Sequence, residues 1–203
     1  MPVPSFQQLR NSVRTAIRDT CGLLWDDSAL DGIINEAQRE YSILSGSITD
    51  SIHVFGTENG VFLLPDDFLE PVRFIGSDKL EKPFYSWRYL DQLYPDFRNI
   101  TGSGVRGIIF DFDNWGNARI FPRIPDKLFA GTLFYKRLAA TNKIETRNLE
   151  AVEQHCLYQV FSLTGKEGAS RYYAQFLDSV NEEGNLYRSL SAGSRIRKGC
   201  FFR

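Results

Sequence analysis

Residues Tyr41–Phe55 read YSILSGSITDSIHVF, and the spacing of the apolar side chains changes within this segment. Upstream, apolar residues recur at helical spacing, at Leu30, Ile33, Ile34, Ala37 and Tyr41. Beyond Gly46, the run Ser51–Phe55 is short and β-rich, which is typical of a strand. We therefore predict that a helix ends near Gly46 and that a β-rich region begins at about residue 48.

A first helix is predicted upstream of this one. Phe6, Leu9, Val13 and Ile17 recur at helical spacing. Ser5 is a candidate N-cap for a helix that runs to about Thr20 and is closed by Gly22. Asp26 or Asp27 then caps the helix that ends near Gly46.

Six short β-rich runs follow, each bounded by Gly, Pro or Asn. They are Ser51–Phe55, Val61–Leu64, Val72–Ile75, Arg106–Phe112, Ala118–Phe121 and Thr132–Arg137. The turn residues Asp113–Asn117 predict that the fourth and fifth runs form a hairpin. Between the third and fourth runs, Ser86 is expected to cap a short helix that Pro95 stops.

Helical spacing returns after Ile144. Two stripes of apolar residues predict two helices. The first stripe ends at Gly165, and the second starts at Ala169 and continues past Gly184 to Leu190. The stripe residues are Leu149, Val152, Cys156, Val160, Leu163, Ala169, Tyr172, Tyr173, Phe176 and Val180.

The change in apolar spacing from helical to strand-like and back predicts an α+β protein. Residues 1–47 and 140–191 form a helical core of about four helices, contributed by both chain ends. Residues 48–139 form an inserted, mostly antiparallel β domain. Residues 192–203 lack an amphipathic period and are predicted to form an extended C-terminal arm.

Composition narrows the possible functions. With 203 residues, of which 42% are hydrophobic and 14% aromatic, the chain can bury a real core. It contains no apolar run of the ~18 residues that a membrane helix needs, and MPVPSFQQLR does not resemble a secretory leader, so we expect no membrane partner. Three widely spaced cysteines predict reduced thiols, and two histidines offer little for zinc. We expect no cofactor.

The charge is distributed unevenly along the chain. Beyond Glu183 there is no acid, and this segment carries the cations Arg188, Arg195, Arg197, Lys198 and Arg203. The other 19 basic residues face 25 acids, which leaves the body with a net charge of about −6. An acidic body with a basic tail does not resemble a nucleic-acid-binding domain, which is basic over a whole face. It indicates a solvated body with one interaction arm.

Two acidic pairs are candidates for chemistry. Asp66 and Asp67 have no recognisable partner base, and we interpret Asp66 as the cap of one helical turn that holds Phe68 and the following leucine against the core. Asp111 and Asp113 form a D-x-D, whose alternate residues share a strand face and could hold a divalent cation. Because Asp113 falls in the predicted turn and no third ligand is evident, we favour a turn.

A histidine and a cysteine are adjacent at His155–Cys156. Neighbouring residues on a helix point about 100° apart, so they do not form a thiol–imidazole pair. Because Cys156 belongs to an apolar stripe, we predict a packed, inert thiol.

An aromatic segment is the other candidate site. Its aromatic residues are interleaved with Lys82, Arg88 and Arg98, which could make a stacking platform for single-stranded nucleic acid. Asp91 and Asp96 dilute the positive charge, so we favour a protein–protein interface. The candidate interface residues are Tyr85, Trp87, Tyr89, Tyr94 and Phe97.

The order of these features resembles the head-to-tail adaptor (connector) proteins of tailed bacteriophages, over about residues 20–180. In such proteins one strand ends in the sequence Leu-Pro, acidic residue, aromatic residue. This sequence leads into another strand. Later an apolar strand ends in Pro-x-x-Pro and is followed by a strand with a tyrosine and basic residues. The matching segments here are WDDSALDGIINEAQREY, GVFLLPDDFLEPVRF, NARIFPRIPD, GTLFYKRLA and IETRNLEAVEQHCLYQVFSLTGKEGASRYYAQF. Phe62 stands where a tyrosine is expected, and the loop 95–104 is long.

The resemblance implies a structural virion protein and not an enzyme. Such adaptors form rings, usually of twelve subunits, between the portal protein and a tail or nozzle protein, in the virion neck, after assembly in the host cytoplasm. DNA crosses the ring only as passing cargo. The arm residues Arg195, Arg197, Lys198, Phe201, Phe202 and Arg203 are then expected to bind the portal. The aromatic interface is expected to face the tail or a neighbouring subunit. Two alternatives stay open, a metal-dependent nuclease or processing enzyme that uses Asp111 and Asp113, and a nucleic-acid-binding module that uses the basic tail.

Overall fold

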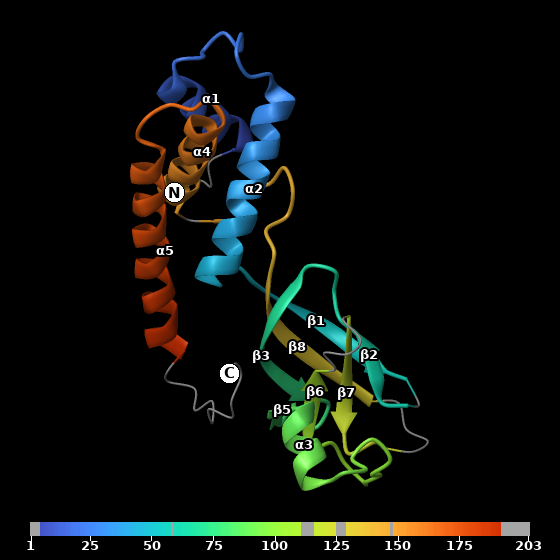
Figure 1. The fold of residues 1–203 in the computed structure, drawn as a ribbon. Coiled ribbons are helices and arrows are strands. Elements are labelled where there is room, and N and C mark those ends of the chain that lie inside the picture. Colours follow the sequence, from blue (N-terminus) through green and yellow to red (C-terminus); the bar gives the residue numbers. More distant parts are fainter. Residues whose placement is uncertain (1–4, 58, 111–115, 125–128, 147, 192–203) are drawn as a thin grey trace. The chain divides into compact units, whose positions relative to one another are not determined.

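The structure is a computed structural model that describes residues 5–57, 59–110, 116–124, 129–146 and 148–191 (Figure 1). These residues form two compact units. The helical unit consists of the described residues up to Ile48 and from Arg137 onward, and the β unit consists of those from Thr49 to Lys136. The predicted arm and the D-x-D acids lie outside the described residues.

The helical unit contains the helices α1 (Phe6–Ile17), α2 (Asp27–Ser45), α4 (Leu149–Leu163) and α5 (Ala169–Ser191). Local capping explains where the first two begin. Ser5 accepts a hydrogen bond from the Gln8 amide at 3.2 Å, and the Gln8 side chain accepts one from the Ser5 amide at 2.7 Å. Asp26 caps α2 by accepting from the Ala29 amide at 2.7 Å.

The first helix is shorter than the sequence predicts. It ends at Ile17 and not near Thr20, because Arg18 adopts a left-handed conformation with φ 60°. The Arg18 amide donates to the carbonyls of Arg14 and Thr15, which closes the last turn. Gly22, with φ 68°, lies in the loop beyond the helix and does not close it.

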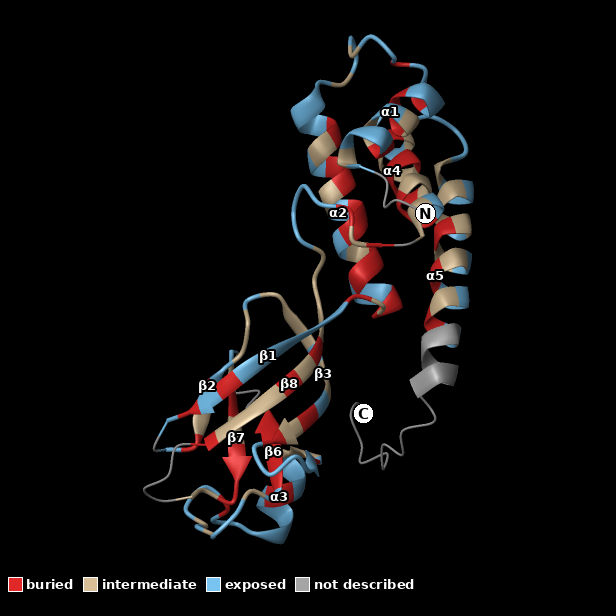
Figure 2. Cartoon of the chain, turned by 180° about the vertical axis from the view of Figure 1, so that it is seen from behind, coloured by how far each residue is buried: buried red, intermediate tan, exposed pale blue. Residues whose placement is uncertain are grey.

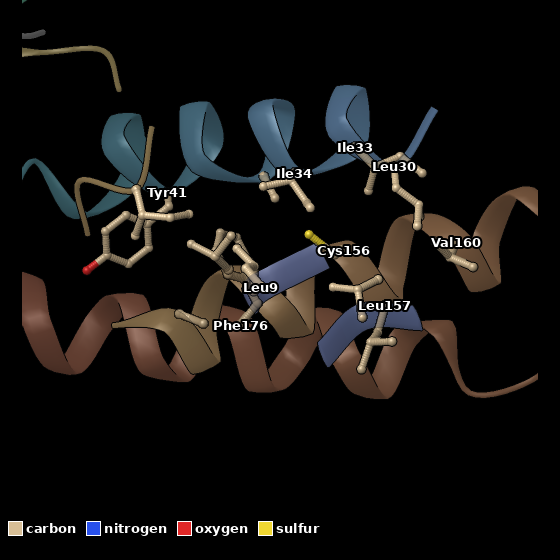
Figure 3. Packing of buried hydrophobic residues seen from close by; sticks show 14 of the residues in the cluster. Leu9, Leu30, Ile33, Ile34, Tyr41, Cys156, Leu157, Val160 and Phe176 are labelled. Atoms are coloured by element: carbon tan, nitrogen blue, oxygen red, sulfur yellow. The ribbon is translucent and has the colours of Figure 1, made fainter. Parts of the chain in front are cut away.

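Apolar stripes from the four named helices meet in one core, which Figure 3 shows from close by. Leu9 of α1, Ile34 of α2, Cys156 of α4 and Phe176 of α5 are all buried in it. The helices from both chain ends therefore pack on one another, and the predicted α+β fold with a helical core is confirmed.

The β unit contains two four-stranded sheets and the helix α3 (Trp87–Leu93). The first sheet has the order β1 (Thr49–Gly56), β8 (Phe129–Arg137), β3 (Phe68–Gly76), β4 (Glu81–Lys82). The second has the order β2 (Val61–Leu63), β7 (Asn117–Phe121), β6 (Gly107–Phe110), β5 (Phe84–Ser86).

Pairing in these sheets is mostly antiparallel, as predicted. β1 pairs with β8 from Thr49↔Lys136 to Gly56↔Phe129, and β6 pairs with β7 as the predicted hairpin requires. β5 is parallel to β6. The strands β4 and β5 were not predicted, because two or three residues on either side of Pro83 are too few to show a period.

Side chains pack on both faces of the second sheet. Its strands β6 and β7 accordingly appear mostly in the colour of buried residues in Figure 2. On one face Ile108 and Phe110 pack with Phe74 and Leu133 of the first sheet. On the other face Ile109 packs in a cluster with residues of the α3 segment. All four residues of β6 are consequently buried, so this strand lacks the alternation of a half-exposed strand.

The turn that contains Asp66 and Asp67 differs from the prediction in one respect. The Phe68 amide donates to the Pro65 carbonyl at 3.0 Å, and β3 starts at Phe68, so Asp66 does not cap a helical turn. A tight turn from Pro65 to Phe68 takes the place of the predicted helical turn. Phe68 does pack on the core, where its ring lies 5.6 Å from that of Phe110.

Candidate functional site

The α3 segment presents the aromatic residues predicted to form an interface. Ser86 caps α3 by accepting a hydrogen bond from the Tyr89 amide at 3.3 Å, as the sequence predicts. At the other end, the Tyr94 amide donates to the Leu90 carbonyl at 2.7 Å, and Pro95 cannot continue the helix. This short helix therefore turns its aromatic side chains out on either side of a buried leucine.

The buried cluster beneath α3 fixes the helix on the second sheet. Leu90 and Phe97 pack with Ile109 and Phe121. Phe97 is only 6% exposed, so it supports the surface from below and does not belong to it. What remains at the surface is Tyr85 and Trp87, both half-buried, and Tyr89 and Tyr94, both exposed; we call these four residues the aromatic surface.

Ring contacts hold the aromatic surface in place. Tyr85 stacks on Tyr89 with centroids 6.3 Å apart, and it meets Phe121 edge-on at 6.1 Å. The Tyr94 ring lies 5.9 Å from that of Phe121. A Cβ at Gly107 would lie 2.3 Å from Cε2 of Tyr85, so a glycine at this position leaves room for the ring. The surface is thus preorganised, which reduces the entropy that a partner must overcome.

Charges around the aromatic surface are mixed. The Arg88 guanidinium lies 5.5 Å from the centroid of the Trp87 ring, and the Arg98 guanidinium lies 5.6 Å from that of Phe97. Asp91 and the carboxylate of Asp96 are also exposed. A phosphate-binding face would be basic throughout, whereas arginine and aromatic residues with few net charges are typical of protein contacts.

The adjacent pair His155 and Cys156 is buried in the helical unit. Burial raises the pKa of the Cys156 thiol, which agrees with the predicted packed, unreactive cysteine. Nε2 of His155 lies 2.7 Å from Oε2 of Glu40, and the ring centroids of His155 and Phe176 are 4.6 Å apart. Burial lowers the pKa of His155, although the Glu40 carboxylate opposes the effect.

The structure does not test the two D-x-D acids, for which the sequence favours a turn over a metal site. Asp111 and Asp113 lie outside the described residues, and among the residues that are described no group of three or more His, Cys, Asp or Glu side chains is arranged to hold a metal ion. None of the helices in the described part of the chain is long and apolar enough to span a bilayer.

Sequence reasoning missed a second apolar surface, in the loop between α1 and α2. Leu23 and Leu24 lie in this loop and are largely exposed, next to the half-buried Trp25. The available signal was that neither leucine belongs to the stripe of α1 or α2. Two apolar residues between Gly22 and the capping Asp26 that belong to neither stripe predict an exposed apolar surface in this loop.

Comparison with known proteins places these features in one family. The family described as SU10 adaptor protein matches residues 4–198, which include both units and the aromatic surface. Among curated proteins, none matches the chain.

Proposed function

Because the chain belongs to the SU10 adaptor protein family, we propose that it is the head-to-tail adaptor of a tailed bacteriophage. In this proposal identical copies, twelve by the family resemblance, form a ring in the virion neck between the portal protein and the tail or nozzle protein. The ring assembles in the host cytoplasm, and DNA passes through it as cargo. The family match over residues 4–198 is the observation that carries the proposal.

The aromatic surface supports a structural role. Its rings are fixed by α3 and by the sheet below, its charges are mixed, and its aromatic and arginine side chains are those that dominate binding energy at protein interfaces. We assign it to contact with the tail component or with the neighbouring subunit.

The charge distribution also suits an adaptor. Ahead of the basic tail the chain carries a net charge of about −6. A channel wall that bound phosphates would retain the genome, because neutralising phosphates with Lys and Arg gives strong binding to DNA. An acidic body allows DNA to pass.

The C-terminal arm, residues 192–203, is proposed to dock on the portal. It has four cations and no acid, and it carries the aromatic pair Phe201 and Phe202, each of which could contribute ~1.5–3 kcal/mol when buried in a partner. Ordering the arm opposes binding by ~1–2 kcal/mol per backbone residue fixed. One arm should therefore bind weakly, and a ring of arms should bind firmly through effective concentration.

The proposal is tested by mixing the protein with portal rings. We expect that deleting the chain after Gly193 removes attachment, measured as co-sedimentation of the two components. Phe201→Ala with Phe202→Ala should weaken attachment at every salt concentration, because burial of the rings does not depend on ionic strength. Complexes that form equally well without the arm would show that the arm does not dock there.

The same preparation separates the adaptor from the two alternatives. Magnesium-dependent DNA cleavage that Asp111→Ala with Asp113→Ala abolishes would identify a nuclease. Tight, salt-sensitive DNA binding through the arm cations would identify a nucleic-acid-binding module. An adaptor should show neither, and the double alanine variant should still attach to the portal.

A further inference from the structure

We propose that the C-terminal arm, residues 192–203, pairs as an added strand with the free edge of β1 in its own chain, and that it leaves this edge when it docks on a partner. We call this edge, formed by Thr49–Gly56, the β1 edge. The added strand would run parallel to β1. Its role as a cover before portal attachment rests on the docking proposed above, whereas the pairing itself does not.

β1 is the longest strand edge that the described part of the β unit leaves unpaired. It is the first strand in the order β1-β8-β3-β4 and has eight residues, whereas the other edge strands, β4, β2 and β5, have two or three. Most of β1 has the colour of exposed residues in Figure 2. It pairs with β8 without a bulge and contains neither proline nor lysine. Proteins ordinarily protect such an edge with these features or by covering it.

The pairing with β8 identifies the backbone groups that point outward. The Arg137 amide donates to the Ile48 carbonyl at 3.0 Å, so these two residues form a hydrogen-bonded pair. Such pairs alternate with non-bonded pairs along an antiparallel ladder, and the register of β1 with β8 is continuous. The Ser51 amide accordingly donates to the Asp50 carboxylate at 2.7 Å. The outward amides are those of Thr49, Ser51, His53 and Phe55.

The beginning of the arm is tethered near the beginning of β1. Within the helical unit, a Cβ at Gly184 of α5 would lie 3.9 Å from the carbonyl oxygen of Ser45, the last residue of α2. From Ser45, residues 46–48 lead into β1 over at most ~14 Å, and from Gly184 α5 rises only ~10 Å to its end at Ser191. The arm can span up to ~40 Å, so it reaches β1 however the two units are arranged.

Side chains along the β1 edge match those of the arm in order. At the start of β1, Asp50 lies opposite Tyr135, whose hydroxyl donates to Asp67 at 3.3 Å, so two carboxylates lie here. At the other end, Phe55 is 72% exposed. In the arm, three of the four cations precede the aromatic pair. A parallel strand therefore places cations near the carboxylates and aromatic rings near Phe55.

A tethered strand suits a cover that has to be removed. Main-chain hydrogen bonds to a sheet edge hold an extended segment, and the tether gives that segment a high effective concentration. A short strand pair is still marginal in water by itself. The arm would therefore cover the β1 edge in the free protein and leave it for a partner that binds its cations and phenylalanines more tightly.

The first test compares amide exchange, measured by NMR without portal rings, in the full chain and in a chain deleted after Gly193. Deletion should increase exchange of the outward amides of His53 and Phe55 about tenfold or more, because they lose their acceptors. The amides of Ile52 and Val54 face β8 and are the internal control, which should change less than about twofold. Equal exchange of the outward amides in the two proteins would overturn the proposal.

A spin label on Cys200 tests the strand direction and the origin of the arm. Cys21→Ser removes an exposed thiol, and Cys156 is buried. The label should broaden the amide resonance of Phe55 more than that of Thr49, because a parallel arm ends near the end of β1. Stronger broadening at Thr49 would overturn the parallel pairing. When the spin label and the isotope label are on different chains, broadening should disappear, and its persistence would overturn pairing within one chain.

His53→Pro blocks the β1 edge while the arm stays intact. Proline removes an outward donor and none of the bonds to β8, which is why edge strands tolerate it. The immobilised fraction of a spin label on Cys200 should fall about tenfold, in line with lost strand pairing. His53→Ala is the matched control, since it keeps the amide and should leave the label as in the wild type. A label that stays equally immobile in the proline variant would contradict the pairing.

Portal rings separate this proposal from the docking role of the arm. If the arm is paired in about nine of ten copies, its release strengthens apparent attachment about tenfold, so His53→Pro should attach more tightly than His53→Ala. Equal attachment would reject the role as a cover. Outward amides that depend on the arm in a protein that never binds portal rings would reject docking and leave the pairing standing. Arm-dependent attachment with outward amides that do not depend on the arm would reject the pairing alone.

Discussion

At the residue scale, the aromatic surface depends on the absence of a Cβ at Gly107. A methyl group there would meet the Tyr85 ring at 2.3 Å and the Pro83 carbonyl oxygen at 2.8 Å. Both neighbours are held by strand pairing, so the ring has to leave its place. We predict that Gly107→Ala destabilises the protein by ~1–3 kcal/mol through overpacking and displaces Tyr85 from Tyr89.

Urea unfolding measures the change in free energy, and near-UV circular dichroism reports the displaced ring. Gly104→Ala is the matched control, because a Cβ at Gly104 meets nothing within 4 Å. That variant should stay within ~0.5 kcal/mol of the wild type. Equal effects of the two substitutions would mean that the close contact under Tyr85 is not important.

A second residue-scale prediction concerns the ion pair between Arg137 and Glu145. The two guanidinium nitrogens donate to the two carboxylate oxygens at 2.8 and 2.7 Å, and the Ala140 amide donates to the same carboxylate at 2.8 Å. Burial alone would raise the pKa of Glu145, but these hydrogen bonds outweigh it and hold the pKa at about 2. Because the folded-state pKa lies below the ordinary 4.5, the stabilisation is present above about pH 4.5 and is lost as the pH falls toward 2.

Glu145→Gln should therefore lower the free energy of unfolding by ~2–3 kcal/mol at pH 7 and by much less near pH 2. The control is Glu70→Gln, which breaks the exposed Lys136–Glu70 pair at 2.7 Å and should change stability by less than ~1 kcal/mol. Urea titrations at several pH values measure both variants. A loss in Glu145→Gln that does not vary with pH would contradict the assignment.

Single residues differ in how far their environment could be predicted. Cys156 was assigned to the core correctly, because its helix shows a clear apolar stripe. The burial of Phe97 beneath α3 was not predicted. Phe97 lies beyond Pro95, where the sequence shows neither helical nor strand periodicity. Its burial depends on packing with Ile109, which is distant in sequence. Long-range packing of this kind leaves no local pattern.

At the element scale, the loop between α1 and α2 is predicted to owe its order to Asp19. Its carboxylate accepts amide hydrogen bonds from Leu23, Leu24 and Trp25. Burial raises the pKa of Asp19, but these bonds and the charge of Arg14 lower it further, and the net pKa lies below the ordinary 3.8. The contribution of Asp19 to stability is thus present above about pH 3.8 and is lost as the pH falls below that value.

We expect Asp19→Ala to increase hydrogen exchange at the amides of Leu23, Leu24 and Trp25 by about tenfold or more, because they lose their acceptor. Exchange in α4 and α5 should change much less. Thr20→Ala, at an exposed neighbouring position, is the control and should leave the loop protected. Unchanged exchange in the Asp19 variant would show that the loop is ordered by other contacts.

Helix ends and strands were predictable where the local sequence marks them, for example by a capping side chain. They were not predictable where the local sequence carries no such mark. Ser86 and Asp26 have cap side chains, so the starts of α3 and α2 follow from the sequence. The end of α1 does not, since Arg18 adopts a left-handed conformation that glycine would ordinarily supply. The parallel pairing of β5 with β6 depends on the placement of the whole second sheet, which three residues cannot encode.

At the scale of the whole molecule, the switches between helical and strand periods identified the α+β fold and the order of its parts. The cleft beside Leu24 could not be predicted in the same way. It depends on Leu24 and Val160 coming together, and these residues belong to opposite ends of the chain. The assignment of residues 1–47 and 140–191 to one helical core domain stays a prediction, and whether such a unit folds alone is a separate question.

The connection between the units suggests a direct test of that assignment. The chain leaves the helical unit after Ile48 and returns at Arg137, whose amide donates to the Ile48 carbonyl at 3.0 Å. Two residues in this hydrogen-bonded antiparallel relation can be joined by a two-residue turn, for which Asn-Gly is the preferred sequence. Replacing residues 49–136 with Asn-Gly should therefore close the helical unit without straining it.

We predict that this shortened protein keeps its helices and unfolds cooperatively, because every buried residue of the helical core comes from the retained segments. Far-UV circular dichroism during urea unfolding measures the transition, and its slope with urea should be smaller than that of the full chain, since less surface is exposed. The hydrogen bonds of Asp19 lie wholly in the retained part, so the amides of Leu23 and Trp25 should also stay protected from exchange. The control carries Val13→Asp, which places a charge in the core and should abolish the transition. A shortened protein that aggregates or unfolds without cooperativity would mean that the helices need the β unit to fold, and that the two units form a single domain.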